Sequence, residues 1–151
     1  MNTWPILHQL FEQQTRIVVP KIVGKQSADM AMVLAPSERA LTDLPLDKWN
    51  IPIPDEGWGE QQLADIDVVL VPCVAVDRRC NRLGHGKGYY DCFIERSTIA
   101  RRAKGLGPPV TIALALREQV VDEDKIPLGP YDQQLDFIVS PDFVARKPTE
   151  S

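Results

Sequence analysis

The sequence predicts a three-layer α/β/α domain with a mostly parallel central sheet, formed by residues 1–151 as a single domain. Strands, a glycine-rich loop and a helix alternate along its second half, as in layered α/β domains. The run at 67–72 is apolar and β-branched, which predicts a strand buried on both faces of a parallel sheet. A chain of 151 residues can bury a hydrophobic core that needs neither disulfides nor a metal.

The first third of the chain predicts one helix and two strands. The helix begins near Thr3, a good N-cap, and Pro5 is tolerated in its first turn. Residues 16–19 predict a short buried strand that Pro20 ends. Residues 30–34 alternate large apolar and small side chains, which suits a second strand.

The remaining elements follow a long connection at 35–59. This connection is rich in Pro and Asp, and we expect an ordered loop in which Trp49 and Ile51 are the apolar anchors. Beyond the strand at 67–72, the pattern predicts an amphipathic helix at 89–104 and apolar strands at 110–116 and 136–140.

The composition is that of an ordinary globular protein, with 44% hydrophobic and 25% charged residues. This excludes a disordered chain and a coiled coil. The longest uncharged apolar run, at 68–75, is far shorter than the ~20 residues of a membrane span, and no secretory signal opens the chain. The three cysteines form no Cys-x-x-Cys pair, so we expect a cytoplasmic protein with free thiols.

Charge is distributed unevenly along the chain. Residues 78–104 contain eight basic and two acidic side chains, although the whole chain has a net charge of −4. A local basic stretch in an acidic protein favours a small anionic ligand over nucleic acid. A solvated helix face is an equally simple explanation of the charge alone.

The segment 81–91 reads NRLGHGKGYYD and is the most informative part of the chain. Glycines at alternate positions let a backbone turn tightly and bring its N–H groups close to a ligand. The helix that follows directs its positive end at the loop, and Arg82 and Lys87 add full positive charges. These features predict a phosphate-binding loop, although the glycine spacing alone is also that of a surface turn. The spacing matches neither the P-loop nor the dinucleotide-binding fingerprint.

The full string RLGHGKGYYD resembles the signature of the 5-formyltetrahydrofolate cyclo-ligase family. The resemblance extends to DVVLVPCVAVD at 67–77, TIALALREQ at 111–119, YDQQLDFIV at 131–139 and WNIP at 49–52. It implies a ligase that uses ATP to convert 5-formyltetrahydrofolate into 5,10-methenyltetrahydrofolate, ADP and phosphate. Mg²⁺ would be the cofactor and ATP a co-substrate. The partners would be small molecules, with no nucleic acid and no membrane.

The resemblance also implies roles for individual residues. It assigns catalysis to Lys87, Tyr89 and Arg82. It assigns nucleotide binding to Arg82, Leu83, Gly84, His85, Gly86, Lys87, Gly88, Tyr89 and Tyr90. It assigns folate binding to Trp49, His85, Gly86, Lys87, Gly88 and Tyr89. It assigns magnesium binding to Asp91 and Asp132. Asp91 could instead be a simple first-turn acid, Asp132 a turn residue and Trp49 a core residue.

The chain departs from the family pattern at several positions. Cys73 and Cys80 stand where family members have glycines, and Cys92 stands where many have arginine. Family members also begin with a basic helix and a first strand, which are missing here, so we expect an N-terminally truncated domain. An unpaired sheet edge would then favour self-association in place of the family's monomer. The alternative to an active ligase is an inactive remnant that still binds nucleotide or folate. A sugar-phosphate isomerase or acyl-CoA transferase layout has only fold analogy in its favour.

Overall fold

The computed structural model describes residues 1–123 and 125–148, which form two compact units. The first unit comprises residues 1–25 and 29–62, and the second comprises residues 26–28 and the chain from 63 onward. The first unit contains α1 (Trp4–Glu12), β1 (Val18–Ile22), β2 (Met30–Leu34) and α2 (Glu38–Thr42). The second contains η1 (Leu63–Asp65), β3 (Val68–Leu70), β4 (Ala75–Val76), β5 (Arg82–Leu83), α3 (Tyr89–Ala103), β6 (Val110–Leu114), η2 (Arg117–Gln119), β7 (Phe137–Val139) and β8 (Val144–Arg146).

Helix α1 packs its apolar side chains against a small core in the first unit. Leu7, Leu10 and Phe11 contact a buried cluster that includes Ile17 and Leu41. The predicted helix start is confirmed, but the predicted cap is wrong. Thr3 has helical backbone angles, and its side chain makes no capping hydrogen bond. Pro5 in the first turn is accommodated as expected.

Strand β1 continues through Pro20, so the prediction that this proline ends the strand is wrong. Pro20 lies opposite Met32 in the antiparallel pair of β1 and β2. This sheet has two strands, so β1 keeps one edge free of backbone pairing within it. Pro lacks an N–H and is compatible with such an edge strand. The predicted strand at 30–34 is confirmed as β2.

Trp49 and Ile51 do not anchor the connection at 35–59, although Leu41, Leu44 and Trp58 of the same connection belong to or pack against the core of the first unit. Trp49 is 71% exposed and Ile51 is 58% exposed. Asp47 orders the loop instead, because its Oδ1 accepts hydrogen bonds from the backbone N–H groups of Trp49 and Ile51 at 2.7 and 2.9 Å. The same connection contains α2, whose N-cap Ser37 accepts a hydrogen bond from Ala40 N. A hydrogen-bonded tip therefore replaces the predicted apolar anchor.

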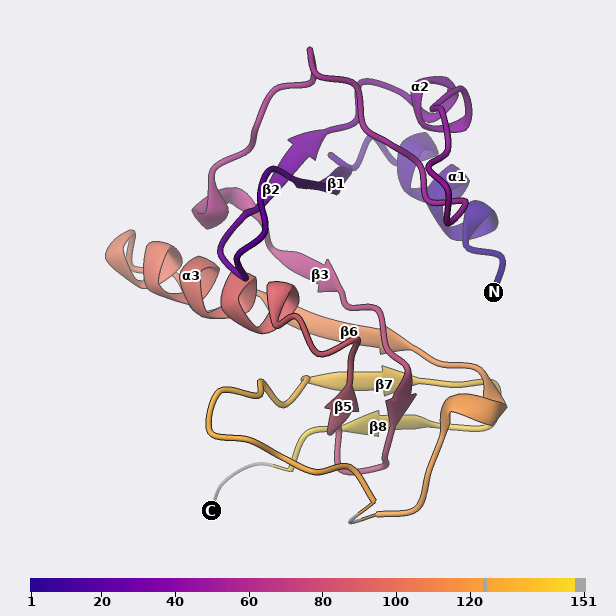
Figure 1. Ribbon diagram of the computed structural model, residues 1–151, viewed down its shortest axis with the longest axis vertical. Helices are drawn as coiled ribbons and strands as arrows, with labels where there is room; N and C mark the ends of the chain where they lie inside the picture. Colours follow the sequence, from indigo (N-terminus) through magenta and orange to yellow (C-terminus); the bar gives the residue numbers. More distant parts are fainter. Residues whose placement is uncertain (124, 149–151) are drawn as a thin grey trace. The chain divides into compact units, whose positions relative to one another are not determined.

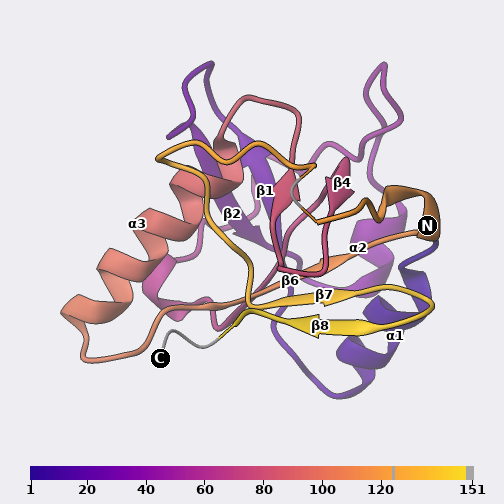
Figure 2. The ribbon, with the colours of Figure 1, turned by 90° about the horizontal axis from the view of Figure 1, so that it is seen from below.

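The second unit is built on a four-stranded sheet with the strand order β3-β6-β7-β8. β3, β6 and β7 are parallel to one another, and β8 joins β7 as an antiparallel strand. Figures 1 and 2 show α3 lying along one face of this sheet. The protein is therefore a mixed α/β structure with a mainly parallel sheet, as the sequence predicted, whereas the three-layer α/β/α arrangement stays a prediction.

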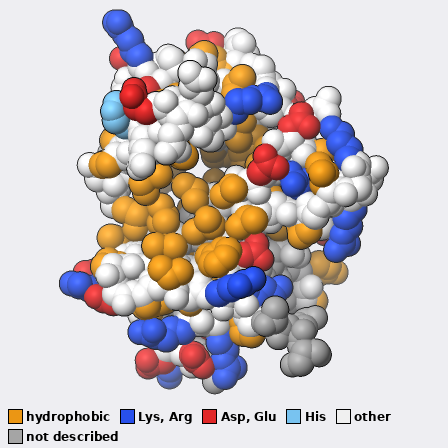
Figure 3. All heavy atoms as spheres, turned by 180° about the vertical axis from the view of Figure 1, so that it is seen from behind, with side chains coloured by type: hydrophobic (Ala, Val, Ile, Leu, Met, Phe, Trp, Pro, Cys, Tyr) orange, Lys and Arg blue, Asp and Glu red, His pale blue; other side chains and the backbone are white. Residues whose placement is uncertain are grey.

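The sheet of this unit is buried on one face. Val69, Ala113 and Ile138 are almost completely buried, whereas Val68 is 53% exposed and Leu70 is 45% exposed. The prediction that the strand at 67–72 is buried on both faces is therefore wrong. In the view from behind in Figure 3, hydrophobic side chains (orange) gather in the middle of the visible surface. Within the described residues, no helix is long and apolar enough to cross a membrane.

Candidate active site

A tight turn between β4 and β5 carries the chain into the glycine-rich loop. The two strands pair antiparallel, with Val76 opposite Arg82. Asp77 is completely buried in the turn. Its Oδ1 accepts hydrogen bonds from the backbone N–H groups of Arg79 and Asn81, and its Oδ2 accepts one from the Asn81 side chain at 2.8 Å. This carboxylate replaces missing backbone partners in the turn and fixes the direction in which β5 leaves it.

The glycine-rich loop has the backbone conformation that its glycines permit. Gly86 has φ of 81° and Gly88 has φ of 69°, and Gly88 is the residue before the first turn of α3. Residues 85–88 are all exposed. No side chain caps the start of α3, and Lys87 makes no hydrogen bond or ion pair with the described residues. The loop therefore presents a positive helix end and an ammonium group to solvent.

Arg82 points into the protein and does not share this exposure. Its side chain is 7% exposed, and its Nη2 forms an ion pair with Asp91 Oδ2 at 2.7 Å. Its Nη1 donates to the carbonyl oxygen of Pro72 at 3.1 Å. The Nε atom is buried and has no hydrogen-bond partner among the described residues. The guanidinium is therefore engaged inside the protein.

The two aspartates predicted as metal ligands both accept hydrogen bonds from the chain segment around Tyr131. Asp91 Oδ1 accepts from the backbone N–H of Gln133 at 3.0 Å. Asp132 Oδ2 accepts from the backbone N–H of Gly129 at 2.6 Å. The first bond joins the segment 129–134 to the start of α3, and the second closes a turn within the segment.

A pocket of about 320 Å³ lies where this segment faces the glycine-rich loop. It collects five of the residues predicted from the sequence: Gly86, Lys87, Gly88, Asp91 and Asp132. Four other residues line it that were not predicted from the sequence: Ser27, Cys92, Glu95 and Tyr131. Glu95 follows Asp91 by four residues, and this helical spacing is the one signal that could have found it. Nothing in the sequence relates Ser27 to the loop.

The other predicted nucleotide-binding residues lie beside this pocket without lining it. Tyr89 and Tyr90 are half-buried in the first turn of α3, and burial raises the pKa of the Tyr90 hydroxyl. Leu83 is 41% exposed on β5, and His85 is exposed in the loop. Gly84 is half-buried beside Arg82, and a Cβ at this position would lie 2.5 Å from Arg82 Nη1.

Trp49, the residue predicted to stack on the folate, belongs to the first unit. Its ring is exposed, and the Lys48 ammonium lies 5.3 Å from the ring centroid. The ammonium over the indole is a cation–π contact. The predicted role of Trp49 stays a prediction.

Most basic side chains of residues 78–104 form contacts that stabilise the fold. Arg101 is buried and donates to the carbonyl oxygens of Gly107 and Ile66, which joins the end of α3 to the start of the sheet. Arg96 donates to the carbonyl oxygen of Ala28 at 2.8 Å. Lys104 pairs with Asp65 at 3.2 Å. Of the basic side chains at 78–104, Lys87 is the one that lines the pocket.

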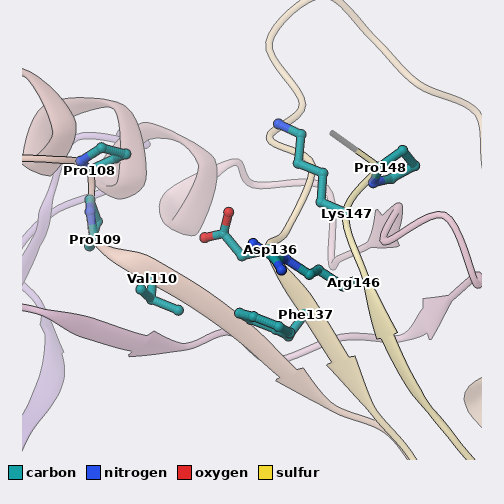
Figure 4. A pocket seen from close by; sticks show the side chains of 8 residues that line it. All are labelled: Pro108, Pro109, Val110, Asp136, Phe137, Arg146, Lys147 and Pro148. Carbon is teal, nitrogen blue, oxygen red and sulfur yellow. The ribbon is translucent and has the colours of Figure 1, made fainter. Parts of the chain in front are cut away.

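A second cavity of about 580 Å³ lies at the other end of the parallel strands (Figure 4). Its lining includes Val110 and Phe137, the first residues of β6 and β7, together with Arg146 and Lys147 at the end of β8. None of the residues predicted from the sequence lines it. The pocket beside Lys87 is therefore the candidate active site.

Comparison with known proteins agrees with the resemblance seen in the loop. The 5-formyltetrahydrofolate cyclo-ligase family matches residues 1–141. The chain belongs to this family. It is 32% identical to the mouse (Mus musculus) protein named "5-formyltetrahydrofolate cyclo-ligase", over 96% of this chain and 70% of that protein. It is also 32% identical to a Schizosaccharomyces pombe protein named "Probable 5-formyltetrahydrofolate cyclo-ligase", over 97% of this chain and 71% of that protein.

A solved structure shows the same fold. The NMR structure of a 5,10-methenyltetrahydrofolate synthetase from Aquifex aeolicus matches with a TM-score of 0.72 and 24% sequence identity. The match covers all of this chain and 68% of that one. Proteins of this cyclo-ligase family are ligases. Four residues of the segment 81–91 line the pocket: Gly86, Lys87, Gly88 and Asp91.

The structure describes the surroundings of two of the cysteines. Cys80 has φ of 66°, the left-handed conformation that favours glycine, in keeping with the expectation from the resemblance that a glycine stands here in related proteins. Burial raises the pKa of its thiol to about 11, so this cysteine is a structural residue. Burial also raises the pKa of the Cys73 thiol, and Cys73 Sγ lies 3.9 Å from the carbonyl oxygen of Leu114.

The carboxylates of the pocket would suit a magnesium ion only as part of a larger set of ligands. No group of three or more His, Cys, Asp or Glu side chains among the described residues could hold a metal ion by itself. Mg²⁺ is commonly bound by one or two carboxylates together with substrate phosphates and water. Asp91 accepts hydrogen bonds from Arg82 and Gln133, and Asp132 accepts one from Gly129. Each carboxylate keeps lone pairs on its oxygens, so the two fit a site that a phosphate completes.

Proposed function

We propose that this chain catalyses the ATP-dependent ring closure of 5-formyltetrahydrofolate to 5,10-methenyltetrahydrofolate. The formyl oxygen attacks the γ-phosphorus of ATP, and ADP leaves. N10 of the folate then attacks the activated formyl carbon, and the oxygen leaves as part of inorganic phosphate. The observation that carries the proposal is the pocket that Lys87, Asp91 and Asp132 line together. It lies beside the start of α3, where no side chain caps the helix.

Phosphoryl transfer requires positioning and neutralisation of charge more than covalent chemistry from the protein. The Lys87 ammonium would bind the transferred phosphate as a point charge, and the backbone N–H groups at Gly86 and Gly88 would bind neighbouring phosphate oxygens. Asp91 and Asp132 would hold Mg²⁺, which would neutralise phosphate charge when bound.

The folate would bind next to the same loop. His85 and Tyr89 would border its reactive end. These roles follow the family signature. The loop conformation, which leaves residues 85–88 open to solvent, supports them.

The substitution Lys87→Ala tests this proposal. We expect kcat/KM for ATP to fall about 100-fold or more, since one preorganised charge on a reacting phosphate has an effect of that order. The free energy of unfolding should change by less than about 0.5 kcal/mol, because Lys87 forms no hydrogen bond or ion pair with a described residue. Formation of the methenyl product is followed by absorbance, and binding of ATP by calorimetry.

The matched control is Arg102→Ala, which removes an exposed cation from the far end of the same helix. Its activity should equal that of the unmodified chain. Full activity of Lys87→Ala at limiting ATP would contradict the proposal. An unmodified chain that binds ATP and folate without turnover would instead be the inactive binding protein considered above.

A further inference from the structure

We propose that Arg82 is a positioning residue, which acts through Asp91 to hold the segment 129–134 as one wall of the nucleotide pocket. This inference rests on the proposed function. Arg82 Nη2 contacts Asp91 Oδ2 at 2.7 Å, and Asp91 Oδ1 accepts a hydrogen bond from Gln133 N at 3.0 Å. The two bonds connect β5, the first turn of α3 and a segment that lies 42 residues further along the chain.

The guanidinium of Arg82 is committed to this contact. Its side chain is 7% exposed and that of Asp91 is 16% exposed, so the pair is largely removed from water. Its second arm donates to the carbonyl oxygen of Pro72. Turning Arg82 toward a phosphate would leave the Asp91 charge without its partner, and breaking a buried pair is costly. Lys87, which is exposed and unpaired among the described residues, faces no such penalty.

Gly84 supports the same interpretation. Its φ does not require glycine, but a Cβ there would lie 2.5 Å from Arg82 Nη1 and 3.4 Å from Arg82 Cζ. The absence of a side chain therefore leaves room for the planar guanidinium in the orientation that meets Asp91. Gly84 leaves space for the Arg82 side chain, whereas Gly86 and Gly88 allow the backbone to adopt positive φ.

The segment held by this contact supplies two residues of the pocket, Tyr131 and Asp132. Tyr131 is 83% exposed, so packing does not hold it in place. The segment is tied to the rest of the unit by Gln133 N on Asp91 and by the Gln134 side chain, which lies 3.3 Å from Asn81 Oδ1. Loss of the Asp91 contact would leave the wall with fewer links, and the nucleotide would have to order it on binding.

Amide hydrogen exchange at Gln133 tests the coupling without any ligand. In Arg82→Gln we expect the protection of the Gln133 amide to fall about tenfold or more, because its acceptor Asp91 is no longer held. The amides of β6 should keep their protection, which shows that the sheet is intact. KM for ATP should rise about tenfold while kcat changes less, because the variant loosens the wall that orients the nucleotide but leaves Lys87, which would bind the transferred phosphate, in place.

Arg82→Lys is the conservative variant, and Arg102→Gln is the control for loss of an arginine. An ammonium in place of the guanidinium keeps a donor and a positive charge for Asp91. Arg82→Lys should therefore recover part of the Gln133 protection and part of the ATP affinity. Arg102→Gln should change neither, because Arg102 is exposed at the other end of α3.

Two results would overturn the positioning role. If ATP affinity falls in Arg82→Gln while Gln133 keeps its protection, Arg82 is a direct phosphate ligand. If neither quantity changes, Arg82 has no role in the pocket. An unmodified chain that binds no ATP would refute the proposed function, whereas exchange at Gln133 would still decide whether Arg82 holds the segment.

Discussion

Asp77 illustrates how one buried side chain supports the site without belonging to it. Its carboxylate receives three hydrogen bonds inside the turn that precedes Arg82. We expect Asp77→Ala to lower the free energy of unfolding by about 2–4 kcal/mol, because it leaves buried N–H groups without acceptors. Urea denaturation followed by circular dichroism measures this change.

Asp77→Asn and Asp122→Ala are the comparisons for this measurement. Asn keeps one acceptor oxygen for the two backbone N–H groups. Asp77→Asn should therefore lower the free energy of unfolding, but by less than Asp77→Ala. Asp122 is an exposed acid, and its removal should change stability by less than about 0.5 kcal/mol. A loss of similar size in Asp77→Ala and Asp122→Ala would refute the structural role of Asp77.

Single residues of the site differ in how well the sequence predicts them. The alternate glycines predict a tight loop, and the positive φ values of Gly86 and Gly88 confirm it. Cys80 adopts left-handed angles, which favour glycine, at the position where the resemblance led us to expect one. The inward direction of Arg82 could not be predicted, because it depends on Asp91 and Gln133, which only the fold brings beside it.

At the scale of elements, α1 and α2 are joined by a contact that responds to pH. His8 Nδ1 lies 3.0 Å from Glu38 Oε2. The hydrogen bond to Glu38 and the Glu38 charge raise the pKa of His8 above its ordinary value of 6.5. The contribution to stability is complete below the unfolded pKa and is lost as the pH rises through the higher folded pKa.

The melting temperature of His8→Gln relative to the unmodified chain tests this contact across pH. We expect the variant to melt lower than the unmodified chain near pH 5, and the difference to vanish above about pH 8. His85→Gln is the control, since His85 is the other histidine and forms no ion pair among the described residues. A difference that grows toward high pH would show that the sign is wrong.

Elements with a strong periodic pattern were predicted well, and short ones were not. The helix at 89–104 and the strands at 30–34 and 110–116 are confirmed as α3, β2 and β6. The two-residue strands β4 and β5 are too short for any periodicity to show. The exposed side of β3 was missed because an apolar strand has the same sequence pattern whether one or two of its faces are covered.

At the scale of the whole molecule, the sequence predicted the fold class and the family, because a signature of consecutive residues carries both. It did not predict the division into two units. The division follows from where long-range contacts concentrate, and no composition change in the sequence marks it. The structure also reveals an uncovered apolar sheet face that the sequence could not indicate.

This sheet face should make the chain associate with itself. Val68 and Leu70 on β3, Val110 on β6 and Val144 on β8 are all more than a third exposed. β3 is also an edge strand, with one side of its backbone unpaired within the four-stranded sheet. Apolar surface beside an open strand edge is where soluble proteins pair with another copy. We therefore expect the sedimentation coefficient of the chain to increase with concentration.

Leu70→Lys should reduce this association, because a charge on an edge strand opposes pairing with a second strand. Ile99→Lys is the matched control, since Ile99 is 62% exposed on α3 and lies outside the sheet. Sedimentation velocity over a range of concentrations compares the three proteins. If the unmodified chain stays monomeric, or if both lysine variants reduce association equally, the sheet face is not the surface through which the copies meet. Association that Leu70→Lys alone abolishes would locate the contact at β3, since Ile99→Lys adds the same charge elsewhere.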